Sequence, residues 1–321
     1  MVKIAIIGCG NIARFHVHAF KETGFSIVAI SGRENSSNKL KKFSEINNLP
    51  DSKIFSNSLD LIHSNIWDAL LICCPTKNTL KYLKIASNYK KPILAEKPID
   101  YQSKNLLPLI KYENIKVAFN RRFYDSVKFA KNFYDVNNVS LIKVSIPEKN
   151  NNNSESKKFP DSIYDNSIHM FDLLNYILGS YNFTFCKSFI HESEFKTIIS
   201  TGKSKNGSLV QLDICFNSSD NFSINIISNE KRVELCPIEI AKFYDGIEIT
   251  EPTGEIPIRR YNPILQSELV SINPENTKPG FYEQAQDFYR FCKNESSEGA
   301  TIIDAYNNLK SIEQLFKLQK K

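Results

Sequence analysis

The sequence predicts an α/β protein with two domains: an N-terminal doubly wound parallel sheet and a C-terminal α+β domain with an open, mostly antiparallel sheet. In the first third of the chain, short apolar runs rich in β-branched residues alternate with stretches of helical pattern, which is typical of parallel βαβ units. Beyond a helix expected at 162–178, longer strand-like runs follow one another, which indicates antiparallel pairing. A chain of 321 residues is long enough for two such domains.

The first domain is expected to cover residues 1–118. Its apolar runs are continuous rather than alternating, so helices should bury these strands on both faces of the sheet. Right-handed crossovers then give a doubly wound arrangement. The expected strands are 2–8, 25–30, 69–74, 92–95 and 116–119, and the expected helices are 11–23, 36–46 and 79–88.

The second domain is expected to cover residues 119–300. The polar run KNNNNSESKK at 149–158 cannot bury a face and should form an exposed loop. Asn206-Gly207 and Asp245-Gly246 lie between strand-like runs and should form tight hairpin turns, because these residues tolerate positive φ. The expected strands are 139–146, 183–191, 196–203, 207–216, 222–228, 231–236 and 239–250, and the expected helices are 126–134, 162–178, 280–292 and a last one at 302–318.

Composition and charge argue against several classes of protein. The formal net charge of +6 is spread along the chain, and no block of lysine and arginine resembles a nucleic-acid-binding arm. No apolar run approaches the length of a membrane span, and the first strand begins directly after Met1, so we expect a cytoplasmic protein without a signal peptide. The 7 cysteines form no CxxC pair and no zinc spacing, which indicates buried thiols in a reducing compartment and no metal site.

A glycine-rich turn follows the first strand and opens the first helix. It reads GCGNIA, a GxGxxA pattern, in which Gly8 permits a tight turn and Gly10 lets the backbone approach a pyrophosphate. The helix that begins near Asn11 and Ile12 offers free N–H groups and its positive dipole end to phosphates. The sequence therefore predicts a dinucleotide-binding domain of the Rossmann type.

The residues after the second strand slightly favour NADP over NAD. A carboxylate at this place binds the ribose 2′-hydroxyl of NAD, whereas an arginine accommodates the 2′-phosphate of NADP. Here Ser31, Gly32 and Arg33 follow, and no carboxylate occurs before Glu34. Ser31 and Arg33 could hold the 2′-phosphate. In the alternative interpretation, Arg33 is a surface residue beside the adenine, and the cofactor could equally be NAD.

Two further groups of residues carry candidate chemistry. Lys97, in the segment AEKP directly after a strand, should face the crevice at the carboxyl edge of the sheet, where it could hold a substrate hydroxyl and ease its deprotonation. Asp165, His169 and Asp172 are spaced i, i+4 and i+7, which places them on one helix face. A carboxylate can orient the imidazole and raise its pKa for acid–base catalysis. A purely structural network is the equal alternative for this second group.

Together these motifs resemble the GFO/IDH/MocA family, the glucose–fructose oxidoreductase and inositol dehydrogenase group. The resemblance covers the whole chain and includes the late segment GFYEQAQDFYRF at 280–291. The EKP element followed by DxxxHxxD is far more specific than the glycine motif alone. The motifs that carry it are GCGNIA at 8–13, AEKP at 95–98, NRRF at 120–123 and DxxxHxxD at 165–172.

The resemblance implies roles for residues on both domains. Lys97 would contact nicotinamide and substrate, and Asp165 and His169 would complete the catalytic group, with His169 as the acid–base. Asn120 and Arg122 would face the substrate or the nicotinamide. The substrate would bind between the two domains.

The resemblance also implies how the cofactor and a partner chain are held. Cys74, Pro75 and Glu96 would line the cofactor cleft. The last helix, about 301–320, would pack back on the cofactor domain. The sheet of the second domain would build homodimers or homotetramers.

Together these observations predict an NAD(P)-dependent oxidoreductase. It would transfer a hydride between nicotinamide and a hydroxyl or keto carbon of a sugar, an inositol or a sugar nucleotide. Basic residues near the cleft make an anionic sugar nucleotide plausible. The alternatives are a non-catalytic NAD(P)-binding sensor on the same scaffold and a reductase of a non-sugar carbonyl or imine.

Overall fold

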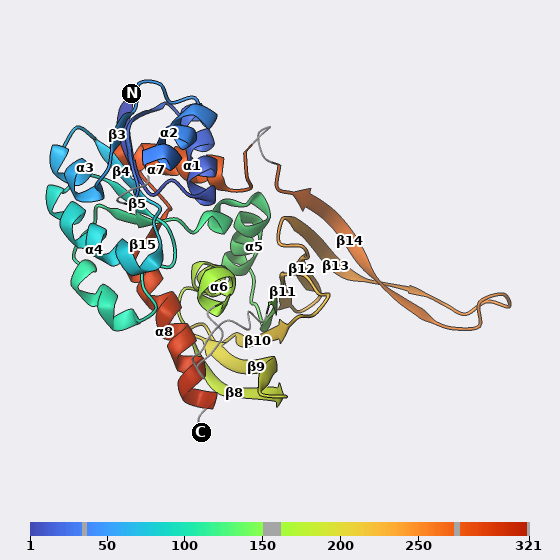
Figure 1. Ribbon diagram of the computed structural model, residues 1–321. Coiled ribbons are helices and arrows are strands. Elements are labelled where there is room, and N and C mark those ends of the chain that lie inside the picture. Colours follow the sequence, from blue (N-terminus) through green and yellow to red (C-terminus); the bar gives the residue numbers. More distant parts are fainter. Residues whose placement is uncertain (34–36, 150–161, 273–276, 320–321) are drawn as a thin grey trace. The chain divides into compact units, whose positions relative to one another are not determined.

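The computed structural model describes residues 1–33, 37–149, 162–272 and 277–319. The described chain divides into two compact units, each treated separately below (Figure 1). The first consists of the described residues within 1–123 and 273–310, and the second of those within 124–272 and 311–321. The polar run at 149–158 falls outside the described residues except for Lys149.

The first unit is built on a seven-stranded sheet with the strand order β15-β6-β5-β4-β1-β2-β3. All neighbouring strands pair in parallel except β15, which is antiparallel to β6. This order reverses direction at β1, so the predicted doubly wound sheet is confirmed. The strands are β1 (Val2–Ile7), β2 (Phe25–Ser31), β3 (Lys53–Phe55), β4 (Ala69–Ile72), β5 (Ile93–Ala95), β6 (Ile115–Val117) and β15 (Ala300–Thr301).

Helices connect these strands, as the apolar spacing of the sequence predicts. Helix α1 is amphipathic and buries Ala13, Val17 and Phe20. The helices of the unit are α1 (Asn11–Glu22), α2 (Ser37–Ile46), α3 (Ser58–Ser64), α4 (Thr76–Ala86), α7 (Phe281–Cys292) and the first part of α8 (Ile302–Gln319), with short 3₁₀ turns η1 (Ser87–Tyr89), η2 (Ser103–Leu109) and η3 (Asn120–Phe123).

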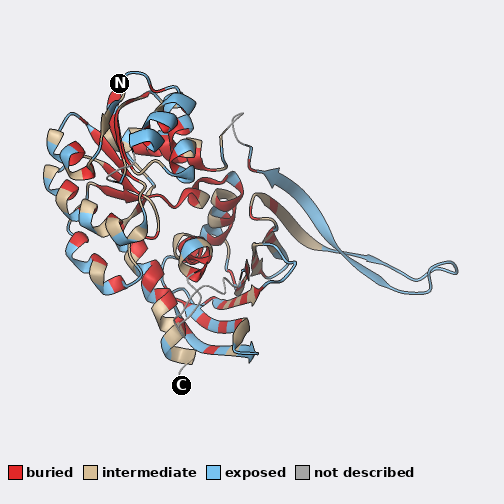
Figure 2. Cartoon of the chain, in the orientation of Figure 1, coloured by how far each residue is buried: buried red, intermediate tan, exposed pale blue. Residues whose placement is uncertain are grey.

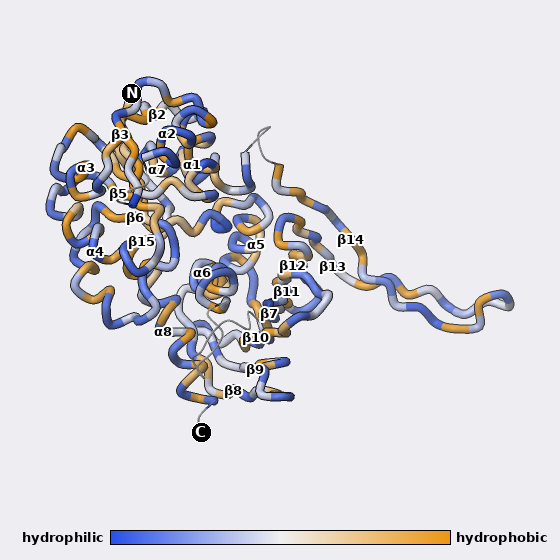
Figure 3. The backbone as a smooth tube through the Cα atoms, in the orientation of Figure 1, coloured by the Kyte–Doolittle hydropathy of each residue, from blue (hydrophilic) through white to orange (hydrophobic). Residues whose placement is uncertain are grey.

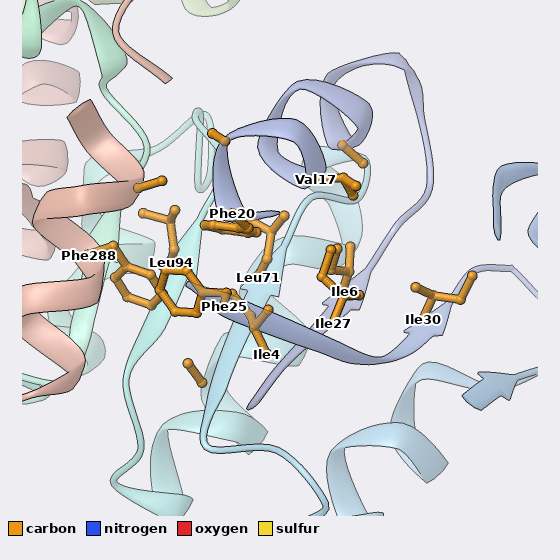
Figure 4. Close-up of a cluster of buried hydrophobic side chains, with 14 of the residues drawn as sticks. Ile4, Ile6, Val17, Phe20, Phe25, Ile27, Ile30, Leu71, Leu94 and Phe288 are labelled. Atoms are coloured by element: carbon orange, nitrogen blue, oxygen red, sulfur yellow. The ribbon is translucent and has the colours of Figure 1, made fainter. Parts of the chain in front are cut away.

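One hydrophobic core joins α1, α2 and α7 to one face of this sheet (Figure 4). Phe20 of α1, Phe25 of β2 and Phe288 of α7 lie together, with 4.8 Å between the ring centroids of Phe20 and Phe25 and 5.9 Å between those of Phe25 and Phe288. Full burial of a side chain of this size stabilises the fold by about 1.5–3 kcal/mol. The core therefore holds α7 on the sheet although the two are far apart in sequence.

This division differs from the expected domain boundaries. The segment 273–300 was expected in the second domain, but its helix α7 packs on α1, and Phe281, Ala285 and Phe288 belong to the core of the first unit. Helix α8 divides near residue 310, and only its first part belongs to the first unit. Its second part bonds to the second unit, where the Gln314 amide pairs with the backbone N–H and carbonyl of Phe183.

The second unit is built on an eight-stranded sheet with the order β14-β13-β12-β11-β7-β10-β9-β8. Its neighbours are antiparallel except for β7 and β10, so the predicted mostly antiparallel sheet is confirmed. The elements are α5 (Asp125–Val136), β7 (Leu141–Glu148), a π-helical turn η4 (Ile163–Ser167), α6 (Ile168–Leu178), β8 (Tyr181–His191), β9 (Glu194–Ser204), β10 (Leu209–Phe216), β11 (Ser223–Ser228), β12 (Lys231–Leu235), β13 (Ile240–Thr250) and β14 (Arg260–Val270).

Alternation along the strands gives this sheet a covered and an uncovered face (Figure 2). On β7, Ile142, Val144 and Ile146 are buried, whereas Lys143 between them is exposed. Strands β10 and β11 repeat the pattern. Helix α5 packs against β12, β13 and β14 and contacts α6. The period of two in the sequence therefore correctly separates the core side of these strands from the other side.

The Asp245-Gly246 prediction was wrong. Strand β13 continues through these residues, and its pairing with β14 is irregular between Tyr244 and Ile247. Gly246 has φ of 78°. A β-bulge and a tight turn both need positive φ, so residue type alone cannot separate them. Asn206-Gly207, by contrast, does form the turn between β9 and β10, with Gly207 at φ of 98°.

Strand β14 was missed because it buries no face. Each of its residues is exposed, so the sequence shows no buried period of two (Figure 2). The outer parts of β13 and β14 form an arm that extends beyond the rest of the sheet (Figure 1). Hydrophobic and hydrophilic residues mix along it, among them the exposed Ile247, Ile249 and Tyr261 (Figure 3). None of the described helices is both long enough and apolar enough to cross a membrane.

Candidate active site

The glycine turn after β1 has the geometry that the GxGxxA pattern predicts. Gly8 has φ of 94°, a conformation that side chains strongly disfavour. A Cβ there would lie 2.1 Å from the carbonyl oxygen of Cys73. The Gly8 N–H donates to the Ser31 carbonyl oxygen over 2.8 Å. Glycine is therefore required at this position for the close approach of β1, β2 and β4.

Gly10 is open where Gly8 is crowded. A Cβ at Gly10 would have no atom within 4 Å, and Gly10 is the N-cap of α1. Among the described residues, no side chain caps this helix end, and its first turn contains no acidic residue. Asn11 and Ile12 are exposed. The first-turn N–H groups and the empty space beside Gly10 thus fit a dinucleotide pyrophosphate.

A cavity of about 360 Å³ lies at this turn, and we call it the glycine pocket. The carboxyl ends of β1, β2 and β4 line it, because parallel strands end at the same edge of the sheet. Helix α2 contributes Lys39 and Leu40, and α4 contributes Asn78 and Tyr82. Of the predicted cofactor-binding residues, this pocket brings together Gly8, Gly10, Arg33, Cys74 and Pro75.

Three thiols at the glycine pocket stay neutral near pH 7. Burial raises the pKa of Cys9 to about 12. Burial also raises the pKa of Cys73, with smaller contributions from Glu96 and from the other two thiols. Burial raises the pKa of Cys74 against a hydrogen bond with Thr79 that lowers it. These side chains therefore place no negative charge beside a bound phosphate.

The structure corrects the role of Ser31. Its side chain is 0% exposed and its hydroxyl donates to Ser58 Oγ over 3.1 Å, so it does not reach the glycine pocket. Arg33 does line the pocket, and Lys39 joins it there. The sequence reasoning missed Lys39 because it lies on the next helix, α2, rather than after the strand. No carboxylate is found among the described lining residues.

Glu96 and Lys97 follow β5 at the same edge of the sheet. The Glu96 N–H donates to the Ile72 carbonyl oxygen over 2.8 Å, which places this backbone beside the end of β4. The Glu96 carboxylate pairs with His16 Nε2 at 2.7 Å and accepts the Lys97 N–H over 3.1 Å. Lys97 is half-buried. The buried His16 was missed because its partner lies 80 residues further along the chain.

Asn120 and Arg122 have partners within the first unit. Asn120 Nδ2 donates to the Pro279 carbonyl oxygen over 2.8 Å. Arg122 forms an ion pair with Asp304 at 3.2 Å. Burial by itself raises the pKa of Asp304, but Arg122 and hydrogen bonds from Thr301 outweigh it, so the pKa lies below its ordinary value. These bonds indicate a structural role, whereas contact of either residue with substrate stays a prediction.

A second cavity, of about 730 Å³, lies in the second unit, and we call it the β7 pocket. It is lined by the end of β7, by residues of the 162–166 segment and by the 217–222 segment between β10 and β11. Asp165 is exposed and lines it, together with Glu148 and Asp220. The sequence reasoning missed Glu148 and Asp220, since each is an isolated carboxylate in the sequence and only the fold brings them near Asp165.

His169 and Asp172 lie on α6 and are buried, unlike Asp165. The predicted shared face assumed α-helical spacing throughout 162–178, but residues Ile163–Ser167 form a π-helical turn. A π turn shifts the register of the residues before it, so the shared face of Asp165 and His169 stays a prediction. The apolar stripe through Ile168 and Phe171 is buried as predicted.

Strand order and glycine turn together define the first unit as a Rossmann-type domain with a phosphate-binding turn. Residues 2–120 match the GFO/IDH/MocA family, the oxidoreductase family with an NAD-binding Rossmann fold. This match agrees with the resemblance that the motifs indicated.

Two proteins with similar sequences are named as an oxidoreductase and a dehydrogenase. An uncharacterized oxidoreductase, YrbE of Bacillus subtilis, is 29% identical over 185 residues, which are 54% of this chain and 53% of the relative. Inositol 2-dehydrogenase of Agrobacterium fabrum is 26% identical over 55% of this chain and 54% of the relative. The chain thus spans about half the length of the curated relatives it matches.

The fold as a whole also has solved counterparts. The crystal structure of an oxidoreductase from Agrobacterium radiobacter, in complex with NAD+, L-tartaric acid and magnesium, superposes with a TM-score of 0.80. The match covers 100% of this chain and 96% of the other, at 15% sequence identity. The likeness therefore shows that the second unit, as well as the first, has the fold of a known oxidoreductase.

Proposed function

We propose that this protein is an NAD(P)-dependent dehydrogenase that acts on a CH–OH group of a sugar-like polyol. The observation that carries the proposal is the glycine turn, where Gly8 is required for the fold and the space beside Gly10 is left open to a pyrophosphate. The family of residues 2–120 and the relative named inositol 2-dehydrogenase agree with this class of activity.

The cofactor would lie with its phosphates at the start of α1. Backbone N–H groups near Asn11 and Ile12 would bind the pyrophosphate, and Cys74 and Pro75 would flank it as part of the pocket lining. A bound nicotinamide supplies the carbon that accepts or donates the hydride. The protein's own contribution is position and proton transfer.

Lys97, Asp165 and His169 are the proposed catalytic residues. The Lys97 ammonium would hold the reacting hydroxyl and favour its deprotonation, since a positive charge stabilises the developing alkoxide. His169 would take the hydroxyl proton, and Asp165 would hold the substrate through its exposed carboxylate. The fixed backbone supports this role for Lys97, because β5 and the Glu96 contacts hold the residue before it.

NADP is the proposed preferred cofactor. Arg33 and Lys39 both line the glycine pocket, and the described lining residues include no carboxylate that would repel a 2′-phosphate. Two cations at this place favour the dianionic 2′-phosphate of NADP over a neutral ribose. Titration with NADPH and NADH in parallel tests this preference, and tighter binding of NADH would refute it.

A second copy of this chain is the proposed partner, in a homodimer or homotetramer built through the sheet of the second unit. The arm of β13 and β14 exposes Ile247, Ile249, Tyr261 and Leu265, and an antiparallel sheet with an exposed apolar surface is a common contact between copies. Light scattering on the purified chain measures the oligomeric state. A monomer at micromolar concentration would refute the proposal.

Replacing Lys97 by alanine tests the catalytic assignment. We expect kcat to fall roughly 10²- to 10⁴-fold, because a positioned proton-transfer group contributes about that much. Cofactor affinity, measured by nicotinamide fluorescence, should stay within about threefold, since phosphate binding does not use Lys97. The exposed Lys104→Ala is the matched control and should keep full turnover. A non-catalytic sensor would bind NAD(P)H yet turn over no polyol even as the unmodified chain.

A further inference from the structure

Helix α1 carries a buried histidine, His16, that packs between aromatic side chains. His16 is 1% exposed, and its ring centroid lies 4.8 Å from that of Phe281 and 5.8 Å from that of Phe20. A buried polar group without a partner costs about 1–3 kcal/mol. The fold supplies a partner from a distant segment, because Nε2 of His16 lies 2.7 Å from Glu96 Oε1. An apolar side chain would fill this space without needing a partner, so the bond to Glu96 is the feature that calls for a function.

The Glu96 carboxylate is fixed by two donors, one on each oxygen. His16 Nε2 bonds to Oε1, and the Lys97 N–H donates to Oε2 over 3.1 Å. Two bonds to different oxygens set both the place and the rotation of a carboxylate, whereas one bond leaves it free to turn. The Glu96 side chain is 13% exposed, so little water competes for these bonds. His16 therefore determines where the acceptor of the Lys97 N–H lies.

The two bonds connect the phosphate-binding helix to the proposed catalytic lysine. Helix α1 begins after Gly10, where a pyrophosphate fits, and carries His16 in its second turn. The helix is held on the sheet by its core residues (Figure 4). One rigid element thus sets the place of the cofactor phosphates and, through Glu96, of the Lys97 backbone. Reacting groups need such support, because a productive geometry must be held to within about 0.5 Å.

Lys278 gives the Glu96 carboxylate an alternative partner. Its ammonium lies over the rings of Phe15 and Phe281, at 5.1 and 5.5 Å from their centroids. Burial lowers the pKa of Lys278, and the negative charge of Glu96 opposes this shift, so the two side chains lie near each other. Without the imidazole of α1, the attraction of this ammonium would turn the carboxylate away from the backbone.

We propose that His16 is a positioning residue for Lys97, which it holds through the Glu96 carboxylate. The inference rests on the proposed function, which gives Lys97 its catalytic role, and adds to it a residue that does not line the glycine pocket. Loss of the bond would lower turnover without weakening the binding of the cofactor phosphates. A histidine that only stabilised the fold would instead change the melting temperature and leave the turnover of the folded protein unaltered.

His16→Phe and His16→Gln separate the hydrogen bond from the packing of the ring. Phenylalanine keeps an aromatic ring beside Phe20 and Phe281 but has no donor, whereas the amide nitrogen of glutamine lies about as far from Cα as Nε2 does. We expect His16→Phe to lower kcat roughly 10- to 100-fold, because a misplacement of about 1 Å can cost that much. His16→Gln should restore kcat to within about fivefold of the unmodified chain. The exposed His18→Phe, on the same helix, is the matched control and should keep full turnover.

Turnover is measured on the full chain by the absorbance of reduced nicotinamide, with NADP+ and with myo-inositol or glucose as substrate. KM for the substrate and the affinity for NADPH should each stay within about threefold in His16→Phe, since the bond acts on the reacting lysine rather than on binding. A His16→Phe variant with the kcat of the unmodified chain would overturn the proposal. A fall in kcat that His16→Gln does not reverse would overturn it too.

The backbone N–H of Lys97 gives a readout that needs no turnover. The full chain is labelled with ¹⁵N-lysine, and the Lys97 amide signal is identified by its absence in Lys97→Arg. Exchange of this N–H in deuterated water should become about tenfold faster or more in His16→Phe, because a bonded amide exchanges only when its bond opens. His16→Gln should keep the slow exchange. Equal exchange rates in His16→Phe and the unmodified chain would refute the assignment.

A double-variant cycle tests whether His16 acts through Glu96. Glu96→Ala removes the acceptor and should itself lower kcat, and His16→Phe added to it should lower kcat no further. The cycle still decides if His16→Phe alone does not fold, because Glu96→Ala removes the carboxylate that His16→Phe leaves without its donor. A double variant clearly slower than Glu96→Ala would contradict the proposal.

The two kinds of readout separate this inference from the function on which it rests. If the unmodified chain oxidises neither polyol but the Lys97 amide responds to His16 as expected, hydride transfer is refuted and the positioning of Lys97 by His16 stands. If the unmodified chain does turn over and neither kcat nor amide exchange depends on His16, the dehydrogenase stands and the positioning role is refuted.

Discussion

The glycine pocket and the β7 pocket differ in charge and in the source of their polar groups. In the glycine pocket, backbone N–H groups, Arg33 and Lys39 supply positive potential, and the thiols are neutral. In the β7 pocket, side-chain carboxylates and amides supply the polar groups. Phosphates are recognised by backbone geometry and cations, whereas hydroxyls need individually placed acceptors. The contrast explains why a short motif reveals the first pocket and no motif reveals the second.

The largest expected effect is a loss of stability on replacing Gly8 of the glycine pocket, which replacing Gly10 should not cause. Gly8→Ala should destabilise the fold by about 3 kcal/mol or more, because its Cβ would collide with the Cys73 carbonyl and its φ is positive. Gly10→Ala has open space, so its melting temperature should stay close to that of the unmodified chain. NADPH affinity should nevertheless fall about tenfold or more, as the methyl group occupies the approach of the pyrophosphate.

Thermal denaturation and NADPH titration of both glycine variants check this expectation. The control within the pair is Gly10→Ala itself, since it carries the same added atom. If the two variants lost stability equally, the crowding at Gly8 would not be the cause. If Gly10→Ala bound NADPH normally, the phosphate site would not lie at this turn.

A smaller effect is expected from the cations of the glycine pocket. Arg33→Ala and Lys39→Ala should each weaken NADPH binding roughly tenfold, because a charge-assisted hydrogen bond contributes about 1.5–3 kcal/mol. NADH binding should change little, since NADH lacks the 2′-phosphate. Lys42→Ala, an exposed lysine on the same helix α2, is the matched control. Equal losses for both cofactors would place these cations at the pyrophosphate instead.

The smallest effect concerns two carboxylates whose pKa values move in opposite directions. Asp304, in the first unit, has a lowered pKa because Arg122 and Thr301 outweigh its burial. Glu148, in the β7 pocket, has a raised pKa because burial, with the nearby Asp165, outweighs the hydrogen bonds from Ser167 and Lys149. The stabilisation by Asp304 is complete above its ordinary pKa of 3.8 and is lost as the pH falls through the lowered value.

The contribution of Glu148 to stability depends on pH in the opposite direction. Stability is lost as the pH rises from its ordinary pKa of 4.5 to its raised value in the folded protein, because ionisation is disfavoured there. Asp304→Asn should therefore flatten the acid-side fall of the melting temperature and lower it near neutral pH. Glu148→Gln should raise the melting temperature relative to the unmodified chain as the pH rises above the ordinary pKa of 4.5. Melting curves across acid to neutral pH check both, and parallel curves for the two variants would contradict them.

Much of the fold was predictable because its signals are local. Buried parallel strands appear as continuous apolar runs, and the strands over the covered face of the second sheet alternate with a period of two. The errors fall where that burial is absent or ambiguous. Strand β14 buries nothing and shows no pattern, and Asp245-Gly246 fits a bulge as well as a turn. Sequence order also does not reveal that α7 packs on α1 in the first unit.

Some residues of the candidate site could likewise be predicted from the sequence, and others could not. The lining of the glycine pocket includes the predicted residues Gly8, Gly10, Arg33, Cys74 and Pro75. The first two belong to one contiguous motif, Arg33 follows a predicted strand, and the family resemblance implied Cys74 and Pro75. Lys39 and His16, and the carboxylates Glu148 and Asp220, could not be predicted. Ser31 was predicted to hold the 2′-phosphate in the pocket, but its hydroxyl bonds to Ser58, which lies 27 residues further along the chain. The sequence does not show this contact.

By itself, the sequence determined the strand–helix alternation, the phosphate-binding turn and the match of residues 2–120 to a known family, because backbone conformation and burial period are properties of neighbouring residues. Only the tertiary structure decided which side chains meet. The pairing of His16 with Glu96, the ion pair of Arg122 with Asp304 and the grouping of Glu148 with Asp165 and Asp220 each join distant segments. Such partners are selected by the packing of whole elements, which no local pattern records.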